Sequence, residues 1–455
     1  MRSLKEERAL LPSNSSVRQG SKESFISRLS EQVLIGMESF IEKRYKKGSM
    51  TSSFFALVNT TMGVGILGLP WAFSKNGLLQ GIMLTIISGL FSVLACILLS
   101  EISLKEDPTG NMMPVTYYSI AEKTFPKLKS IIDTSILVMS LGSCITYLMV
   151  VVAVTQSIFG GFFYGFLSES NTRTLILIFV VVFIIGPASY PTSLAELTVI
   201  NWIAVFSSLY VAAVVIFSFI FGIRDISLML DRVELITTFN PVFMLQTFPI
   251  FVFSFTCHHN FLNVANELAD KTLNKLVTSS VISLAFCTIV YVLMGSSGYL
   301  LFGNTLKSSD ILSMFDTKSL SIVIAKIILV SSLVFSFPVS CHSFRKSLAI
   351  IIKNGVDAED STAKDRNLLR TLTFIFLFIC TTVTYLVTDL GLTYEIVGLF
   401  CSNTVCYFLP AVLYLKLFSG EPWNISKILA VVLLVFSVLV YPLCFTAIMY
   451  THFFS

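Results

Sequence analysis

Eleven apolar stretches, each long enough to cross a bilayer as a helix, dominate this sequence. They lie at about residues 51–74, 78–101, 132–163, 174–191, 197–222, 246–268, 277–302, 320–348, 370–390, 393–417 and 427–452. A helix of about 20 apolar residues crosses the ~30 Å hydrocarbon core of a membrane. The mean hydropathy of +0.82 and the charged fraction of 13% also lie outside the range of soluble domains. The sequence therefore predicts an all-α integral membrane protein with eleven transmembrane helices.

The positive charges predict the orientation of these spans. With the N-terminus in the cytosol, 24 of the 31 Lys and Arg residues fall in cytosolic segments, 6 fall in outer segments, and Lys326 lies within a span. Cytosolic loops carry the excess of Lys and Arg in membrane proteins. We therefore expect a cytosolic N-terminus and an outer C-terminus. We attribute the formal net charge of +4 to this orientation and expect no nucleic-acid partner.

Residues 1–48 are predicted to form a cytosolic tail ahead of the eleven-span domain at 49–455. Apolar residues recur at helical spacing over about 25–47, and this stretch ends in four basic residues. This pattern predicts an amphipathic helix that lies on the inner membrane surface or docks on the cytosolic ends of the spans. The string Glu-Glu-Arg-Ala-Leu-Leu at 6–11 resembles an acidic di-leucine signal, which adaptor proteins read when they sort cargo to lysosomes or vacuoles.

Several other classes of protein are excluded by what the apolar stretches contain. The nine cysteines lie nearly all within them and lack the spacing of zinc ligands, so we expect small core residues and neither a disulfide framework nor a zinc site. No nucleophile–base pattern occurs within the spans, which argues against an enzyme. No repeated filter or ring of charges suggests a channel. We expect no cofactor.

The first span contains a helix-breaking motif at its centre. It reads Asn-Thr-Thr-Met-Gly-Val-Gly-Ile-Leu-Gly-Leu-Pro-Trp over 59–71, with Gly63, Gly65 and Gly68 ahead of Pro70. Glycine and proline both disfavour a continuous helix. A break at membrane depth frees backbone N–H and C=O groups, which protein, water or a ligand must then satisfy. The motif therefore predicts either a binding cavity in a broken helix or, as the alternative, close packing of two helices through small residues.

The sixth span carries a cluster of polar side chains at similar depth. Six of them fall within the eleven residues from Thr256, which include His258, His259 and Asn260. Polar residues inside a membrane are costly and usually face a cavity. In a chain of two five-helix halves of inverted topology, spans one and six are partners. The two histidines are candidates for proton coupling or for substrate contact, although either could instead be satisfied by a backbone carbonyl.

The eighth span carries hydroxyl groups along one helical face. Ser332, Ser336, Ser340 and Ser343 are spaced at i, i+4, i+8 and i+11. Such a stripe often bonds to the preceding turn or to a neighbouring helix. If it faced the break in span one, it could supply oxygen ligands to a cation.

Three strings together resemble the amino acid/auxin permease family. They are Asn59 with the glycine motif at 63–70, Phe-Thr-Cys-His-His-Asn at 255–260 followed by Asn-Glu-Leu at 266–268, and Ser-Phe-Pro at 336–338 with Arg345. The likeness covers about residues 50–452. It is to the branch that holds the sodium-coupled neutral amino acid transporters and the fungal vacuolar amino acid transporters.

The resemblance implies a LeuT-like fold, with five plus five helices in an inverted repeat and one extra helix. It also implies an amino acid bound between spans one and six. We therefore expect a substrate site formed by Thr61, Gly63, Val64, Gly65, Thr256, His258, His259 and Asn260. A possible sodium site is expected at Asn59, Met62, Ser332 and Ser336. Ser336 stands where the sodium-coupled members usually have threonine, and the vacuolar members are proton-linked.

The resulting hypothesis is a secondary active transporter that moves amino acids, neutral ones in the first instance, by alternating access. Symport or antiport with sodium or with protons stays open, as do the vacuolar or lysosomal membrane and the plasma membrane as its location. The alternative is an amino acid sensor that reports to cytosolic partners through the N-terminal tail. The expected partners are the amino acid, the lipid bilayer and sorting adaptors at the di-leucine string.

Overall fold

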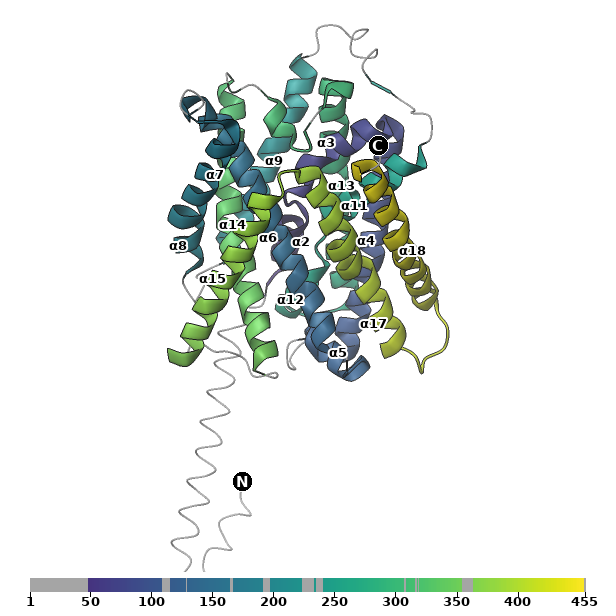
Figure 1. Cartoon of the computed structure of the whole chain (residues 1–455). Coiled ribbons are helices and arrows are strands. Elements are labelled where there is room, and N and C mark those ends of the chain that lie inside the picture. Colours follow the sequence, from purple (N-terminus) through teal and green to yellow (C-terminus); the bar gives the residue numbers. More distant parts are fainter. Residues whose placement is uncertain are drawn as a thin grey trace, which may run out of the picture. The chain divides into compact units, whose positions relative to one another are not determined.

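The computed structural model describes residues 48–108, 115–127, 129–163, 167–190, 197–222, 233–234, 240–306, 308–315, 317, 319–353 and 363–453 (Figure 1). In this part of the chain, ten helical segments are long and apolar enough to cross a membrane, and one bent pair of shorter helices adds an eleventh span. The predicted all-α architecture with eleven spans is therefore confirmed. The amphipathic helix predicted at 25–47 and the di-leucine string at 6–11 lie outside the described residues.

The helices of the first half run from the bent pair α2 and α3 to α9. In chain order they are α2 (Met50–Thr61), α3 (Gly65–Asn76), α4 (Leu78–Glu106), α5 (Tyr117–Thr124), α6 (Lys129–Phe163), α7 (Glu169–Phe179), η2 (Val180–Ile185), α8 (Gly186–Ser189) and α9 (Leu197–Gly222). The second half runs from α11 to α18. Its elements are α11 (Pro241–Ser254), α12 (His258–Glu267), α13 (Leu273–Phe302), η3 (Gly303–Thr305), η4 (Ile311–Met314), α14 (Leu320–Ile352), α15 (Ala363–Leu386), α16 (Leu390–Ile396), η5 (Val397–Ser402), η6 (Thr404–Phe408), α17 (Leu409–Leu417) and α18 (Ile425–Phe453).

The first span is broken at its glycine motif. Helix α2 ends at Thr61, α3 begins at Gly65, and the two helices are bent by 54° relative to one another. The link is held by its own backbone, because the Gly63 N–H donates to the Thr61 carbonyl at 2.8 Å. Pro70 lies inside α3. The interruption therefore comes at the first two glycines, while the helix continues through the proline.

The sixth span is broken as well, over residues 255–257 between α11 and α12. The Thr256 N–H turns back to the Phe253 carbonyl at 3.1 Å, and the Asn260 N–H bonds to the Cys257 carbonyl at 3.0 Å as α12 begins. Both turns are tighter than an α-helical turn, because a donor bonds three residues back instead of four.

The two breaks lie opposite one another. Helix α11 packs against α3, and α12 packs against α2, so the two broken spans run antiparallel and side by side. Tyr291 of α13 lies between their ends, with its hydroxyl 2.7 Å from the Thr61 carbonyl and 2.8 Å from the Ser254 carbonyl. These carbonyls belong to the last residues of α2 and α11. Paired breaks in spans one and six are what an inverted repeat implies, and the repeat itself stays a prediction.

Large apolar side chains remain exposed along the outward faces of several spanning helices, for example Leu90, Phe183, Phe221, Phe378 and Phe453. Such surfaces are rare on water-soluble monomers, since they would promote association. In a bilayer they contact lipid. The chain is therefore a multi-pass membrane protein, with its polar groups turned toward the interior of the bundle.

Candidate functional site

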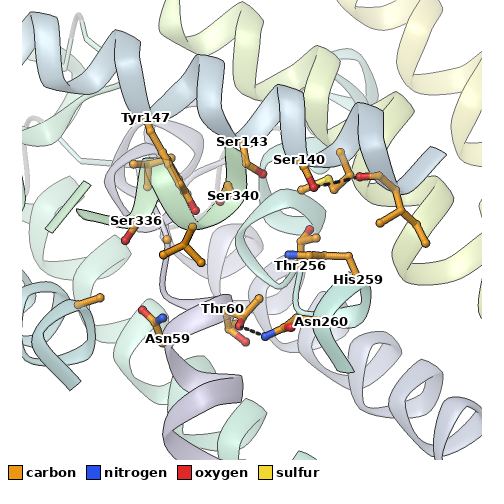
Figure 2. A pocket seen from close by; sticks show the side chains of 18 of the residues that line it. Asn59, Thr60, Ser140, Ser143, Tyr147, Thr256, His259, Asn260, Ser336 and Ser340 are labelled. Atoms are coloured by element: carbon orange, nitrogen blue, oxygen red, sulfur yellow. Dashed lines mark hydrogen bonds between the residues drawn. The ribbon is translucent and has the colours of Figure 1, made fainter. Parts of the chain in front are cut away.

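A cavity of about 290 Å³ lies at the two breaks (Figure 2). The links of both broken spans line it, together with α6, α9 and α14. Eleven of the twelve predicted site residues are among its lining residues: Asn59, Thr61, Met62, Gly63, Val64, Gly65, Thr256, His259, Asn260, Ser332 and Ser336. The structure therefore brings together three segments that are distant in the sequence.

Polar side chains from six helices line the cavity, namely α2, α5, α6, α9, α12 and α14. Ser140, Ser143 and Tyr147 come from α6 and face the broken spans. Across the break, the Asn260 side-chain amide donates to the Thr60 hydroxyl at 3.2 Å and so joins α12 to α2. Apolar residues fill the rest of the wall, among them Ile136, Met139, Leu262, Leu329 and Leu333. The lining therefore combines polar and apolar side chains.

The cavity extends toward the predicted cytosolic face. Its lining includes Thr116, which directly precedes α5, Asn263 in α12 and Ser347 near the end of α14. In the predicted orientation these residues all belong to the cytosolic ends of their segments. Figure 1 shows α5 and α12 toward one end of the bundle and α3 toward the other, near the C-terminus of the chain.

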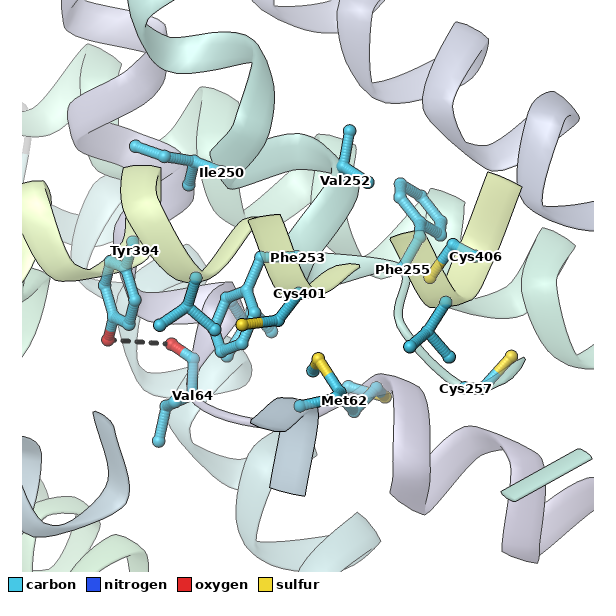
Figure 3. Close-up of a cluster of buried hydrophobic side chains, with 14 of the residues drawn as sticks. Met62, Val64, Ile250, Val252, Phe253, Phe255, Cys257, Tyr394, Cys401 and Cys406 are labelled. Carbon is cyan, nitrogen blue, oxygen red and sulfur yellow. Dashed lines mark hydrogen bonds between the residues drawn. The ribbon is translucent and has the colours of Figure 1, made fainter. Parts of the chain in front are cut away.

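The opposite side is closed by an outer gate, formed by Val64, Phe253 and Tyr394 (Figure 3). The rings of Phe253 and Tyr394 stack with centroids 5.5 Å apart. The Tyr394 hydroxyl donates to the Val64 carbonyl at 3.2 Å. Helix α3 approaches this ring so closely that a Cβ on Gly68 would lie 3.0 Å from it. All three residues of the outer gate are buried.

The two adjacent histidines have different surroundings. His259 lines the cavity, and its Nδ1 has no hydrogen-bond partner among the described residues. His258 does not line it. Its Nε2 lies 3.0 Å from the Ser92 carbonyl of α4, and its own carbonyl accepts from the Tyr117 hydroxyl at 2.8 Å. Burial raises the pKa of Tyr117, so this hydroxyl stays protonated and donates.

His258 also forms part of a buried cluster that its sequence spacing does not predict. One of its ring nitrogens and the Sγ atoms of Cys96 and Cys257 all lie within 4.8 Å of one another. The position of His258, against α4 and behind the cavity wall, is that of a residue holding two helices together. The sequence offered a second interpretation, in which a histidine is satisfied by a backbone carbonyl. The Nε2 of His258, bonded to the Ser92 carbonyl, fits that interpretation.

The four residues expected at a sodium site all line the cavity, and three of their oxygen atoms already take part in hydrogen bonds. The Met62 carbonyl accepts from the Ser208 hydroxyl of α9 at 2.9 Å. The Ser336 hydroxyl donates to the Ser332 carbonyl at 2.9 Å. The Met62 carbonyl and the Ser336 hydroxyl each keep a lone pair that can bind a cation.

Sequence reasoning missed Asp133 of α6. It is the one carboxylate among the residues that line the cavity in the described part of the chain, and its side chain is 9% exposed. Because Asp133 is the second residue of an apolar stretch, its position suggested the membrane boundary and not a binding site. An acidic residue inside a span is a signal of function in its own right, and that signal could have found it.

The sequence matches known proteins over most of its length. The sequence profile described as transmembrane amino acid transporter protein matches residues 46–452. The chain is 28% identical to vacuolar amino acid transporter 5 of Schizosaccharomyces pombe, over 81% of this chain and 84% of that protein. It is 26% identical to vacuolar amino acid transporter 5 of Saccharomyces cerevisiae, over 67% of each chain. It is 23% identical to sodium-coupled neutral amino acid transporter 7 of Danio rerio, over 77% of this chain and 75% of that protein.

Proposed function

Because the chain belongs to the transmembrane amino acid transporter family, we propose that it is a secondary active transporter that moves neutral amino acids across a membrane by alternating access. The observation that carries this proposal is the pair of facing breaks in spans one and six, which meet at a cavity of about 290 Å³. Discontinuous helices at mid-membrane are the usual binding elements of secondary transporters.

The breaks offer complementary charges to a zwitterion. The first N–H groups of α3 have no partner within their own helix and form the positive end of its dipole, which suits a carboxylate. The carbonyl ends of α2 and α11 are the negative ends of their dipoles and attract an ammonium group, while the Thr61 and Ser254 carbonyls themselves already have the Tyr291 hydroxyl as a partner. Gly63 leaves the backbone of the link open to a ligand, because a Cβ there would meet only the Tyr147 side chain, at 3.7 Å, whereas the missing side chain of Gly65 lets α3 pack against Ser254 of α11. The apolar wall is suited to a neutral side chain.

Alternating access requires that the cavity open to one side at a time. An opening toward the predicted cytosolic face, with the Phe253–Tyr394 stack closing the other side, corresponds to the inward-facing state of such a cycle. The outward-facing state would then separate Tyr394 from the Val64 carbonyl.

We favour protons as the coupling ion. Asp133 and His259 are titratable and line the cavity. Relatives named as vacuolar transporters support the same choice and a vacuolar or lysosomal location, where the lumen is acidic. One relative named as sodium-coupled keeps sodium as the second candidate. The di-leucine string at 6–11 of the tail would supply the sorting signal to this membrane.

The test is uptake of each of the twenty amino acids into proteoliposomes that contain the purified protein, with imposed pH or sodium gradients in parallel. We expect accumulation of neutral amino acids that follows the pH gradient and is unaffected by sodium. Saturable binding without any flux would overturn the proposal and favour the amino acid sensor. Accumulation driven by sodium alone would overturn the choice of ion.

A further inference from the structure

A buried carboxylate lies on the outer side of the gate, away from the cavity. Glu395 of α16 is fully buried within a membrane-spanning segment. The Gln246 side-chain amide of α11 donates to its Oε1 at 2.9 Å. The Nε2 of His452, from α18, lies 3.0 Å from its Oε2. Three helices from distant parts of the sequence therefore meet at one carboxyl group.

This cluster adjoins the outer gate. Glu395 directly follows Tyr394, whose hydroxyl bonds to the break in the first span. One turn further, Gly398 packs against α11 so closely that a Cβ there would lie 2.0 Å from the Pro249 carbonyl. The helix that carries Glu395 therefore cannot leave α11 without opening the gate, and it cannot approach α11 more closely.

The charges of the cluster are balanced by a single proton. Placed on either the carboxylate or the imidazole, one proton leaves the pair with no net charge. Without it, a carboxylate is buried in a membrane with an uncharged imidazole and an amide as its bonded partners, which is costly. Among the described residues, the other charged groups that act on Glu395 are Lys75 of α3 and Asp389 at the start of α16, and their charges oppose one another. The side chain of His452 is 22% exposed, so it gives protons a route from the outer face.

We propose that Glu395 and His452 form a proton-binding site that must be occupied for the outer gate to close. The ligand is one proton, taken up from the outer solution through His452 and shared with Glu395. Loss of the proton leaves the Glu395 carboxylate buried without a positive charge beside it in the cluster. Separation of α16 from α11 admits water, which solvates this charge. The inference rests on the proposed transport function only in giving the gate its role, since proton-dependent closure can be measured without transport.

The test uses modification of a cysteine placed in the cytosolic part of the cavity. Asn263→Cys is suitable because Asn263 is exposed there and all nine natural cysteines are buried. In the purified full chain, we expect the modification rate of Asn263→Cys to rise, relative to the same variant carrying Glu395→Gln, as pH falls. The ratio between the two cancels the pH dependence of the thiol itself. A single proton changes this ratio by up to about tenfold per pH unit.

Glu395→Gln is chosen because its amide can keep both bonds, accepting from Gln246 and donating to a neutral His452. It should hold the gate closed at every pH. His452→Gln serves as a second variant if Glu395→Gln does not fold, and it too should flatten the pH response. The matched control is Thr247→Val, which removes the bond of 2.7 Å between Asn76 and Thr247 at the same end of the bundle without changing a titratable group. It should keep the pH response of the parent.

The results separate the two proposals. A modification rate in Glu395→Gln and His452→Gln that follows pH as in the parent would overturn the proton site, whatever transport shows. Absence of amino acid flux in the parent, with a pH response that the two variants remove, would overturn the proposed function and leave the proton site standing.

Discussion

Replacement of Gly65 by alanine should weaken the contact between the two broken spans. A Cβ on Gly65 would lie 2.7 Å from the Ser254 Oγ and 2.8 Å from the Ser254 Cα, where ordinary contacts begin at about 3.4 Å. The Cα belongs to the backbone of α11 and cannot rotate away. Helices α3 and α11 must therefore separate by about 0.6 Å, the difference between 3.4 and 2.8 Å. In a closely packed interior, such overpacking costs ~1–3 kcal/mol.

This cost acts against the intrinsic effect of the substitution, which favours a helix by up to ~1 kcal/mol. If the overpacking cost of ~1–3 kcal/mol falls on the gate-closed state alone, it shifts the equilibrium between the gate-closed and gate-open states by roughly 5- to 150-fold. The assay is amino acid exchange in proteoliposomes, measured beside the thermal stability of the same purified variant. We expect a lower exchange rate and a lower midpoint of unfolding. In Gly65→Ala the added methyl group would collide with Ser254. In Gly63→Ala it would meet the Tyr147 hydroxyl at an ordinary contact distance of 3.7 Å.

Two controls make this prediction specific. Gly63→Ala belongs to the same motif but meets only an ordinary contact, so it should keep the stability of the parent. Gly420→Ala has nothing within 4 Å of its Cβ and should be neutral. Equal stability and exchange in Gly65→Ala and Gly63→Ala would refute the steric reasoning.

Three further changes have outcomes that follow from the described contacts. Asp133→Asn removes the one carboxylate that lines the cavity among the described residues. Uptake driven by a pH gradient should fall by roughly tenfold, corresponding to ~1.4 kcal/mol, and Asp133→Glu should retain more of this uptake. Equal uptake by the two variants would refute this role. Because the proposed coupling ion is the proton, uptake by Ser336→Ala should be as independent of sodium as uptake by the parent; a sodium response of the parent that Ser336→Ala weakens would instead establish a sodium site. Asp107→Asn leaves the buried Lys271 ammonium without its carboxylate at 3.9 Å, so the free energy of unfolding should fall by ~3–5 kcal/mol. Adding Lys271→Met should recover much of that loss in denaturant titrations, and no recovery would contradict the pairing.

The spans and their two breaks could be predicted because their signals are local. A run of apolar residues is readable wherever it lies, and the glycines at 63 and 65 and the polar cluster from Thr256 mark the interruptions within their own segments. The meeting of the two breaks needed one further step, the assumption of two inverted halves. The π-helical turns at 397–408 carry no comparable local signal.

The orientation of single side chains could not be predicted in the same way. His258 and His259 are neighbours in α12, yet one bonds to α4 and the other lines the cavity, because consecutive residues of a helix point about 100° apart. Tyr291 lies between the two breaks from a helix that shows no anomaly in its sequence. The role proposed for Glu395 depends on its contacts with Gln246 and His452, which form only when three helices pack together.

The most direct measurement is a structure of the protein in a lipid nanodisc with the amino acid that it transports best at saturating concentration. We predict density for the amino acid between the links at 62–64 and 255–257, with its carboxylate toward the first turn of α3. Density elsewhere, with this cavity unoccupied by substrate, would contradict the binding site on which the proposed transport cycle depends.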